Sequence, residues 1–387
     1  MPTDPSHPSP PATTIVAPRL FDGTAWHDNV TVDIANGRIA AVTPSARRPA
    51  DNARLLPAGA ILAPGFIDLQ VNGGGGALLN DEPTAATVRT MLAAHRRFGT
   101  TGFLPTLITD SREALAALAA AAAEIAGIPG VLGLHLEGPF LNKARKGVHP
   151  EPHVRSPDTA DIAFIEAIAG RLPLLVTLAP ECVPAGFIAW LVANGIKVAV
   201  GHSNATAAEM QSALAEGATA VTHLFNAMSQ LSPREPGIVG TAFDESRIVA
   251  GLICDGVHVA PANMRTAFKA AGVDRLFLVT DAMPSLGSAS PTFDLQGRTI
   301  TLAGGRLTAP DGTLAGAHLG MIGAVRNATA MIGVPLGDAL IMASRTPARF
   351  LGIDRERGCI AAGAHADLVA FDARFDVIAN WIAGQAH

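Results

Sequence analysis

The feature that most constrains the fold is a unit that repeats between residues 63 and 346, in which a short apolar segment precedes a helical one. The apolar segments are residues 65–69, 102–107, 131–136, 174–178, 197–200, 218–222, 248–253 and 276–280. Strands that alternate with helices predict a parallel sheet with right-handed crossovers. Eight such units within about 280 residues fit a closed (β/α)8 barrel of the TIM type better than an open sheet.

The two chain ends differ from this middle part. Residues 14–62 and 347–387 contain short β-type runs, and Asn36-Gly37 between two of them is a strong hairpin signal. We therefore expect an α/β fold, with a barrel over residues 63–346 and a small β-sandwich domain formed from both chain ends. Residues 290–313 depart from the barrel pattern and predict a hairpin insertion. Residues 1–13, rich in Pro, Ser and Thr, are expected to form a disordered tail.

The composition excludes several classes of protein. Charged residues are 16% of the chain and apolar residues 49%, whereas average domains carry about 25% charged residues. A disordered chain is excluded, and the net charge of −5 argues against a nucleic-acid partner. Residues 114–134 are Ala-rich and too weakly apolar to span a membrane. Since residues 1–14 lack the basic and apolar runs of a signal peptide, the expected location is the cytoplasm.

Ionisable residues stand at the ends of several predicted strands, where barrels carry their chemistry. Glu137, His202 and His223 follow the third, fifth and sixth strands, so they would face one axial cavity. A lone histidine at a strand end is more often a hydrogen-bonded structural residue. One carboxylate and two imidazoles together, however, are a ligand set for a catalytic divalent cation with one position open. We expect one such cation per subunit; zinc is the first choice, and iron or another first-row ion would also fit.

Two further residues are candidates for catalysis. Asp281 ends the eighth strand and is the expected proton-transfer group, because a carboxylate beside an activated water can accept its proton. Taken alone, an aspartate there is more often the N-cap of a following helix. His149, in the loop after the third strand, either donates to a substrate carbonyl or is an ordinary surface histidine, and spacing favours neither interpretation.

Asn226, Arg234 and His258 suggest a site for an anionic group. Arg234 lies in the Pro-rich loop 232–237, and an arginine suits a phosphate or a carboxylate. Next to Glu235, the same arginine could form a surface ion pair of little energetic value. The acidic balance of the whole chain is no objection, since an anion needs only local positive charge.

Taken together, these motifs resemble those of the amidohydrolase superfamily, and within it those of members that deacetylate phosphorylated amino sugars. The matching stretches are PGFIDLQVNG (64–73), GLHLEGPFLN (133–142), KGVH (146–149), GHSNAT (201–206), THLFNAM (222–228), REPG (234–237), DGVH (255–258) and VTDA (279–282). They occur in the family's order and cover nearly the whole chain after the tail. Such a set is far more specific than any single motif.

The resemblance implies hydrolysis of the acetamide of N-acetyl-D-glucosamine 6-phosphate to D-glucosamine 6-phosphate and acetate. It assigns the metal to Glu137, His202 and His223. It assigns water activation and protonation of the leaving amine to Asp281, and polarisation of the acetamide carbonyl to His149. The residues that it implies for substrate binding are His149, Asn226, Ala227 (through its backbone), Arg234, His258, Leu314, Ala315 and Gly316. It also implies a homodimer or a tetramer, with some of these residues reaching across the interface.

One departure from the wider superfamily concerns the number of metals. Many amidohydrolases carry His-x-His at the end of the first strand, whereas this chain has Gln70 and Asn72, and residues 174–180 offer no bridging lysine. Amides are poor metal ligands beside imidazole, so we expect one tightly held metal and at most a weak second one.

Two other functions remain open at this stage. Another amidohydrolase, acting on a cyclic amide or an N-acyl amino acid, would have a two-metal site and no need of a phosphate contact, so Gln70 and Arg234 speak against it. A non-enzymatic assembly protein with this fold would be expected to have lost metal or base positions, and those positions are intact.

Overall fold

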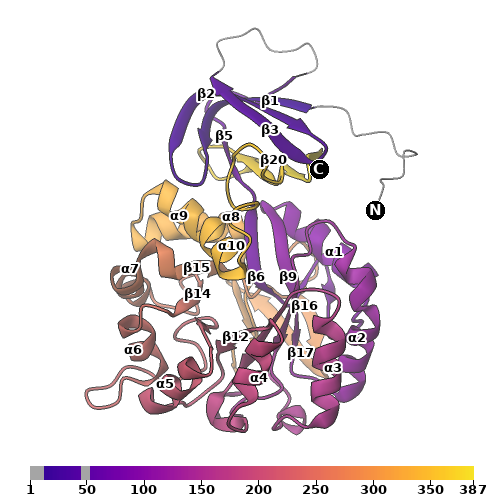
Figure 1. The fold of residues 1–387 in the computed structure, drawn as a ribbon, viewed down its shortest axis with the longest axis vertical. Coiled ribbons are helices and arrows are strands. Elements are labelled where there is room, and N and C mark those ends of the chain that lie inside the picture. The colour runs from indigo at the N-terminus through magenta and orange to yellow at the C-terminus, as the bar shows by residue number, and fades with distance from the viewer. Residues whose placement is uncertain (1–12, 45–52) are drawn as a thin grey trace.

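A parallel barrel occupies the centre of the molecule (Figure 1) in the computed structural model, which describes residues 13–44 and 53–387. Its strands are β6 (Phe66–Val71), β9 (Thr100–Ile108), β10 (Leu134–Glu137), β11 (Leu174–Leu178), β12 (Lys197–Val200), β13 (Ala220–Val221), β14 (Val249–Ile253) and β15 (Leu276–Val279). Each strand pairs in parallel with the next one along the chain. The predicted barrel and all of its strand segments are therefore confirmed.

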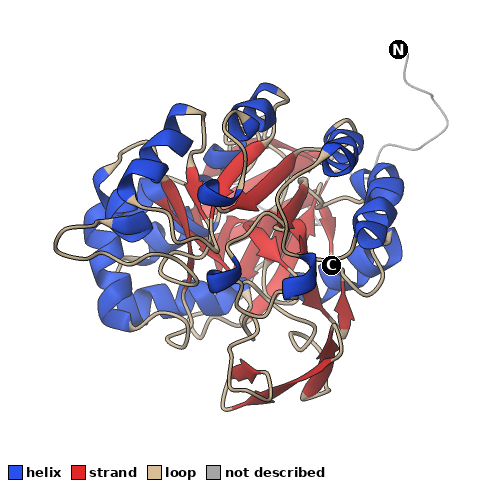
Figure 2. Ribbon diagram, turned by 90° about the horizontal axis from the view of Figure 1, so that it is seen from below, coloured by secondary structure: helices blue, strands red, loops and turns tan. Residues whose placement is uncertain are grey.

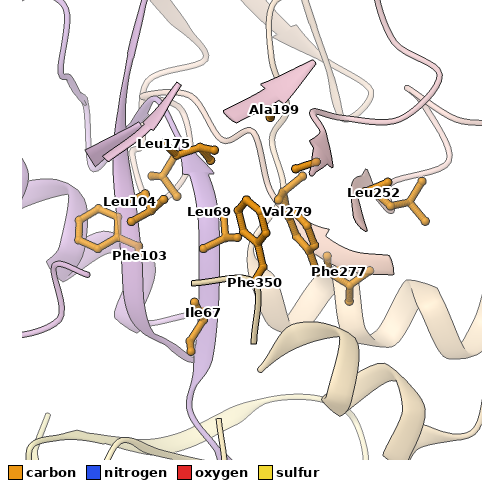
Figure 3. Close-up of a cluster of buried hydrophobic side chains, with 14 of the residues drawn as sticks. Ile67, Leu69, Phe103, Leu104, Leu175, Ala199, Leu252, Phe277, Val279 and Phe350 are labelled. Carbon is orange, nitrogen blue, oxygen red and sulfur yellow. The ribbon is translucent and has the colours of Figure 1, made fainter. Parts of the chain in front are cut away.

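The barrel strands are mostly apolar because both of their faces are covered. Every residue of β6 and of β9 is buried. Inside the barrel, apolar side chains from several strands meet around Phe350 (Figure 3), whose ring stacks on that of Phe277 with the centroids 5.9 Å apart. The core therefore fills the barrel up to the level of the polar strand ends.

Helices cover the outside of the barrel. They are α1 (Ala85–Arg96), α2 (Arg112–Ala126), α3 (Thr159–Ala169), α4 (Phe187–Ala193), α5 (Ala207–Ala215), α6 (Gly237–Asp244), α7 (Pro261–Arg275), α8 (Met321–Asn327), α9 (Leu336–Ala343) and α10 (Arg345–Leu351). Short 3-10 turns are η1 (Lys143–Arg145), η2 (Glu151–His153) and η3 (Pro180–Cys182), and a π-helical turn, η4 (Ala328–Ile332), follows α8. Among the described residues, no helix has both the length and the apolar character needed to cross a membrane.

Both chain ends build one separate sheet, as predicted. Its strands are β1 (Thr13–Phe21), β2 (Trp26–Ala35), β3 (Arg38–Pro44), β4 (Arg54–Leu55), β5 (Ile61–Pro64), β19 (Leu368–Phe371), β20 (Val377–Ile382) and β21 (Gln385–Ala386). This sheet has a hydrophobic core that is distinct from the core of the barrel and includes Ile15, Val32, Leu62, Leu368 and Trp381.

The predicted hairpin near the N-terminal end of the chain is present. Asn36 and Gly37 join β2 to β3 with φ of 52° and 74°, the left-handed geometry that an Asn-Gly hairpin favours. Of the expected tail, residues 1–12 lie outside the described residues, and Thr13 begins β1. The division between the two domains at residues 62/63 and 346/347 stays a prediction.

The carboxyl ends of the barrel strands open away from this end sheet. β6 begins beside β5 and runs away from it (Figure 1), so the strand ends lie at the face seen in Figure 2. Two short strands, β7 (Gly73–Gly74) and β8 (Ala77–Leu78), follow β6 there. The expected hairpin insertion is a three-stranded sheet of β16 (Thr292–Leu295), β17 (Arg298–Ala303) and β18 (Arg306–Thr308). It packs on the loop after β10, where Arg298 donates a hydrogen bond to the Val148 carbonyl.

Candidate active site

A cavity of about 370 Å³ opens at the carboxyl ends of the barrel strands. Its lining includes all of the predicted metal ligands and both candidate catalytic residues, namely Glu137, His202, His223, Asp281 and His149. These five side chains come from four different strand ends and one loop, and each is at least nine-tenths buried. The barrel topology therefore brings together residues that are up to 144 positions apart, from Glu137 to Asp281.

Glu137, His202 and His223 form a tight cluster. Oε1 of Glu137 lies 3.1 Å from Nε2 of His202 and 3.0 Å from Nε2 of His223. The two Nε2 atoms are themselves 3.0 Å apart. A tetrahedral zinc with bonds of roughly 2.0–2.1 Å would hold its donor atoms about 3.3 Å apart, so the three atoms are already close to ligand spacing.

The donor chemistry of this cluster also fits a cation. Nδ1 of His202 lies 2.8 Å from the carbonyl of Arg145, which can only accept, so a neutral His202 directs the lone pair of Nε2 into the cavity. Without a cation, these three acceptor atoms would repel one another unless at least one of them carried a proton and donated it to a neighbour. Accordingly, contact with Glu137 outweighs burial and raises the pKa of His223. Contact with the two histidines likewise outweighs burial and holds the pKa of Glu137 well below its ordinary value.

His149 lies beside this cluster, and its ring centroid is 4.4 Å from that of His202. The nearest donor atoms of Glu137, His149 and His202 all lie within 4.8 Å of one another, so these residues form a second possible ligand set. However, the backbone N–H of Thr109 donates to Nδ1 of His149 at 3.3 Å. Burial lowers the pKa of His149 well below its ordinary value, so the ring is neutral. A neutral ring that accepts at Nδ1 carries its proton on Nε2, which suits a donor to substrate better than a metal ligand.

Asp281 faces the cluster from the end of β15 and is held by two amides. Nδ2 of Asn72 and Nε2 of Gln70 lie 2.7 Å and 3.1 Å from its Oδ1. Nε2 of Gln70 also lies 3.0 Å from Oε1 of Glu137. Burial, followed by the charge of Glu137, raises the pKa of Asp281 to about 6. A carboxylate with a pKa near neutrality is suited to take up and release a proton in each catalytic cycle.

The backbone at these strand ends is unusual. His202, His223 and Asp281 have φ of 49°, 31° and 52°, in the left-handed region that residues other than glycine rarely adopt. Such strain persists only where the surroundings impose it, and it gathers at functional sites. Here it turns each side chain inward at the point where its strand ends.

A comparison with known families and structures identifies the family of this chain. The amidohydrolase family profile matches residues 61–386. The chain belongs to the amidohydrolase family. A relative from Shewanella sp. (strain ANA-3), named N-acetylgalactosamine-6-phosphate deacetylase, is 42% identical over 364 residues, covering 92% of this chain and 91% of the relative. A relative from Haemophilus influenzae, named N-acetylglucosamine-6-phosphate deacetylase, is 36% identical and covers 91% and 93% of the two chains.

Solved structures agree as well. The crystal structure of N-acetylglucosamine-6-phosphate deacetylase from Pasteurella multocida has a TM-score of 0.93 to this amidohydrolase, with 34% identity, and the match covers 97% of this chain and 99% of that one. The fold and the family predicted from the sequence are therefore confirmed.

The amidohydrolase cavity includes most of the residues expected to bind substrate. Asn226, Ala227, His258, Leu314 and Gly316 line it. Nδ1 of His258 lies 2.6 Å from Oδ2 of Asp255, which orients the ring.

Two of the residues expected to bind substrate do not line the cavity. Ala315 is fully buried behind the lining, in a small apolar core with Met283 and Val148. Arg234 is exposed and is not part of the lining. Their roles in binding substrate remain predictions.

Sequence reasoning did not select Arg145, which lines the cavity of this amidohydrolase and whose carbonyl faces His202. The signal that could have found it is the basic stretch Lys143-Ala144-Arg145, which lies directly between two of the matching motifs.

Helix α5, which follows the turn that carries His202, begins with a capping box. Oγ1 of Thr206 accepts from the N–H of Glu209, and the Glu209 carboxylate accepts from the N–H of Thr206. This capping box starts α5 at Ala207.

Proposed function

We propose that this amidohydrolase hydrolyses the acetamide of an N-acetylhexosamine 6-phosphate, with N-acetyl-D-glucosamine 6-phosphate as the expected substrate. The single observation that carries the proposal is the grouping of Glu137, His202 and His223 at ligand spacing, with Asp281 in the same cavity. The names of its relatives support the substrate class. The reaction breaks the amide C–N bond, adds water to the acetyl carbon, and yields acetate and the amine.

Glu137, His202 and His223 would hold the divalent metal. When bound, this ion would act as a Lewis acid and lower the pKa of the attacking water. Asp281 accepts the proton of the attacking water and passes it to the leaving nitrogen, as general base and then general acid. His149 donates from Nε2 to the acetamide oxygen, where negative charge develops in the transition state. Burial of all these groups excludes bulk water and strengthens each interaction.

The test is acetate release from N-acetylglucosamine 6-phosphate, its galacto epimer and unphosphorylated N-acetylglucosamine. Each is assayed with and without a chelator, and again after zinc is restored. We expect turnover of a phosphorylated sugar that is lost with the chelator and recovered with zinc. The galacto epimer is included because relatives named for both sugars match this chain at 36–42% identity. Metal-loaded protein that releases no acetate from any of them would favour an amidohydrolase for a cyclic amide or an N-acyl amino acid.

Three finer points are part of the proposal. The metal is zinc, with iron or another first-row ion able to replace it. The assembly is a homodimer or a tetramer, which light scattering after gel filtration would resolve. The enzyme works in the cytoplasm, in amino-sugar metabolism, which fractionation of the source cells would test.

A further inference from the structure

A buried histidine that the proposed reaction does not use lies beneath the metal cluster. His135 stands on β10 two residues before Glu137, so the two side chains share the inner face of this strand. It is almost fully buried, and among the described residues its ring forms hydrogen bonds with two threonine hydroxyls and no ion pair. Because a buried charge without a partner is costly, this ring is neutral.

The hydrogen bonds of Thr106, on the neighbouring strand β9, locate the proton on this ring. Oγ1 of Thr106 donates to the carbonyl of Leu104 at 3.2 Å. Its one proton is thereby used, so the same oxygen must accept from Nδ1 of His135 at 3.2 Å. His135 therefore carries its proton on Nδ1, which leaves Nε2 as an acceptor.

Two further threonines extend this arrangement toward the metal cluster. Nε2 of His135 lies 2.7 Å from Oγ1 of Thr177, on β11, which must therefore donate. Since the proton of Thr177 points to His135, its oxygen accepts from Oγ1 of Thr222 at 2.6 Å. All four side chains thus donate in one direction, and hydrogen bonds in such a series strengthen one another. We call this series the His135 chain; it consists of Thr222, Thr177, His135 and Thr106.

One end of the His135 chain is anchored on the backbone of the barrel. The N–H of Val71, the last residue of β6, donates to Oγ1 of Thr106 at 2.9 Å. Together with the Leu104 carbonyl on β9, this N–H fixes Thr106 from two sides. The chain therefore rests on backbone groups of two barrel strands, and its other end lies at Thr222.

That other end, Thr222, directly precedes the metal ligand His223. The neighbouring ligand His202 is oriented at Nδ1 by the carbonyl of Arg145, whereas Nδ1 of His223 is buried and has no hydrogen-bond partner in any other described residue. A small cavity of about 10 Å³, whose lining includes His135, Thr222 and His223, lies beside it. A metal-binding imidazole is normally oriented by a hydrogen bond of its second nitrogen. For His223, the fixed hydroxyl of the preceding residue takes over this role.

We propose that His135 is a positioning residue: through Thr177 and Thr222 it holds the strand end that carries His223, and thereby keeps this ligand at the spacing that a metal requires. The inference rests on the proposed function. His135 acts without touching the metal or the substrate, so its removal should weaken metal binding although all three ligands remain in the protein.

The experiment measures the dissociation constant of zinc by competition with a chromophoric chelator. It also records the visible absorption of the cobalt-substituted enzyme, which reports the geometry of the ligands. Thr222→Val removes one hydroxyl at nearly constant shape, and we expect zinc to bind roughly 10- to 100-fold more weakly, the scale of a lost partner behind a metal ligand. Thr222→Ser keeps the hydroxyl and should bind zinc nearly as tightly as the wild type. Both readouts work without substrate.

His135 is tested by variants of its own. His135→Phe removes both ring nitrogens, so it should weaken zinc binding and alter the cobalt absorption as Thr222→Val does. His135→Gln retains a donor and an acceptor and should restore part of the affinity. Because both positions act through one chain, the double variant His135→Phe, Thr222→Val should weaken binding by less than the product of the two single effects. If His135→Phe does not fold, the Thr222→Val and Thr222→Ser pair decides the question.

Thr346→Val is the matched control. Thr346, on α10, is also buried, and its Oγ1 donates to the carbonyl of Val273 at 2.7 Å, outside the His135 chain. This variant should lose thermal stability and leave the zinc affinity and the cobalt absorption unchanged. A purely structural role of the chain would make Thr222→Val behave like this control, and that result would overturn the inference. Failure of the proposed function is a separate outcome, in which the zinc-loaded wild type releases no acetate from the phosphorylated sugars.

Discussion

Nδ2 of Asn72 donates a 2.7 Å hydrogen bond to Oδ1 of Asp281. The bond stabilises the ionised carboxylate and so works against burial and the charge of Glu137, which raise the pKa of Asp281 to about 6. Asn72 takes one of the positions at which many amidohydrolases have a metal-binding histidine, and here its amide supports the proton-transfer group instead.

The first prediction concerns the acid limb of the pH–rate profile. Asp281 accepts a proton only when ionised, so kcat should fall as the pH drops through its pKa. A bound cation adds positive charge, so about 6 is the upper limit expected for that apparent pKa in metal-loaded enzyme. Asn72→Ala removes a bond to the ionised form and should move the limb to higher pH. Asn194→Ala, an exposed amide at the end of α4, should leave it in place; a limb unmoved in Asn72→Ala would contradict the prediction.

Asp281→Asn should abolish most of the activity while the metal stays bound. Loss of a general acid–base group typically costs about 10²–10⁴ in rate. Asparagine has nearly the same shape, and Glu137, His202 and His223 remain intact, so metal content should match the wild type. Acetate release and elemental analysis on the same sample measure both quantities. Substantial turnover in this variant would assign the proton transfer to another group.

The amides of Gln70 and Asn72 predict the metal stoichiometry. Both direct N–H groups at carboxylates, Gln70 at Glu137 and Asp281 and Asn72 at Asp281. Both amides therefore present N–H groups, which cannot bind a cation, to these carboxylates. We expect one equivalent of metal per subunit in fully active enzyme, whereas two tightly bound equivalents would refute this. A Gln70→His, Asn72→His double variant restores imidazoles at these positions and should bind a second ion more readily.

One pair of variants distinguishes the role of His149 from that of His223. His223→Asn should lose metal on dialysis, because it removes a donor 3.0 Å from the other two. His149→Asn should retain metal and lose roughly 10²–10³ in kcat, the scale of a missing oxyanion donor. The reverse pattern of metal loss would establish Glu137, His149 and His202 as the ligands.

The barrel strands and the metal cluster could be predicted from the sequence because the end of a strand is marked by a few consecutive residues. An apolar run followed by Glu or His indicates both where a strand ends and which side chain faces the cavity. The positions of loop residues could not be read in this way. Arg145 lines the cavity, and its contacts come from residues far along the chain: its Nε donates to Oδ1 of Asn204, whose N–H donates to Glu181. Ala315 lies behind the lining, although its neighbours Leu314 and Gly316 face the cavity.

The sequence predicted a closed barrel, but the contacts that close it could not be predicted. β15 and β6 are not joined by a regular ladder; they are linked near their ends, where the N–H of Asp281 donates to the Gln70 carbonyl at 3.0 Å. The buried carboxylate of Asp68 reinforces this seam. It accepts from Oγ1 of Thr280 at 2.5 Å and from the N–H of Thr280 at 3.2 Å. An aspartate inside an apolar strand gave no indication that its partner was the residue next to Asp281.

This seam predicts a pH-dependent stability. Burial raises the pKa of Asp68 to about 7, and the hydrogen bonds from Thr280 do not offset it. A folded-state pKa above the unfolded value means that the contribution of Asp68 is fully present below about pH 4 and is lost as the pH rises through about 7. Asp68→Asn avoids ionisation and can still accept the Thr280 N–H. At pH 8 it should therefore be more stable than the wild type, by at most about 4 kcal/mol, and the advantage should be much smaller at pH 5. Urea unfolding followed by circular dichroism at both pH values measures the difference, and an advantage equal at pH 5 and pH 8 would show that Asp68 is ionised throughout.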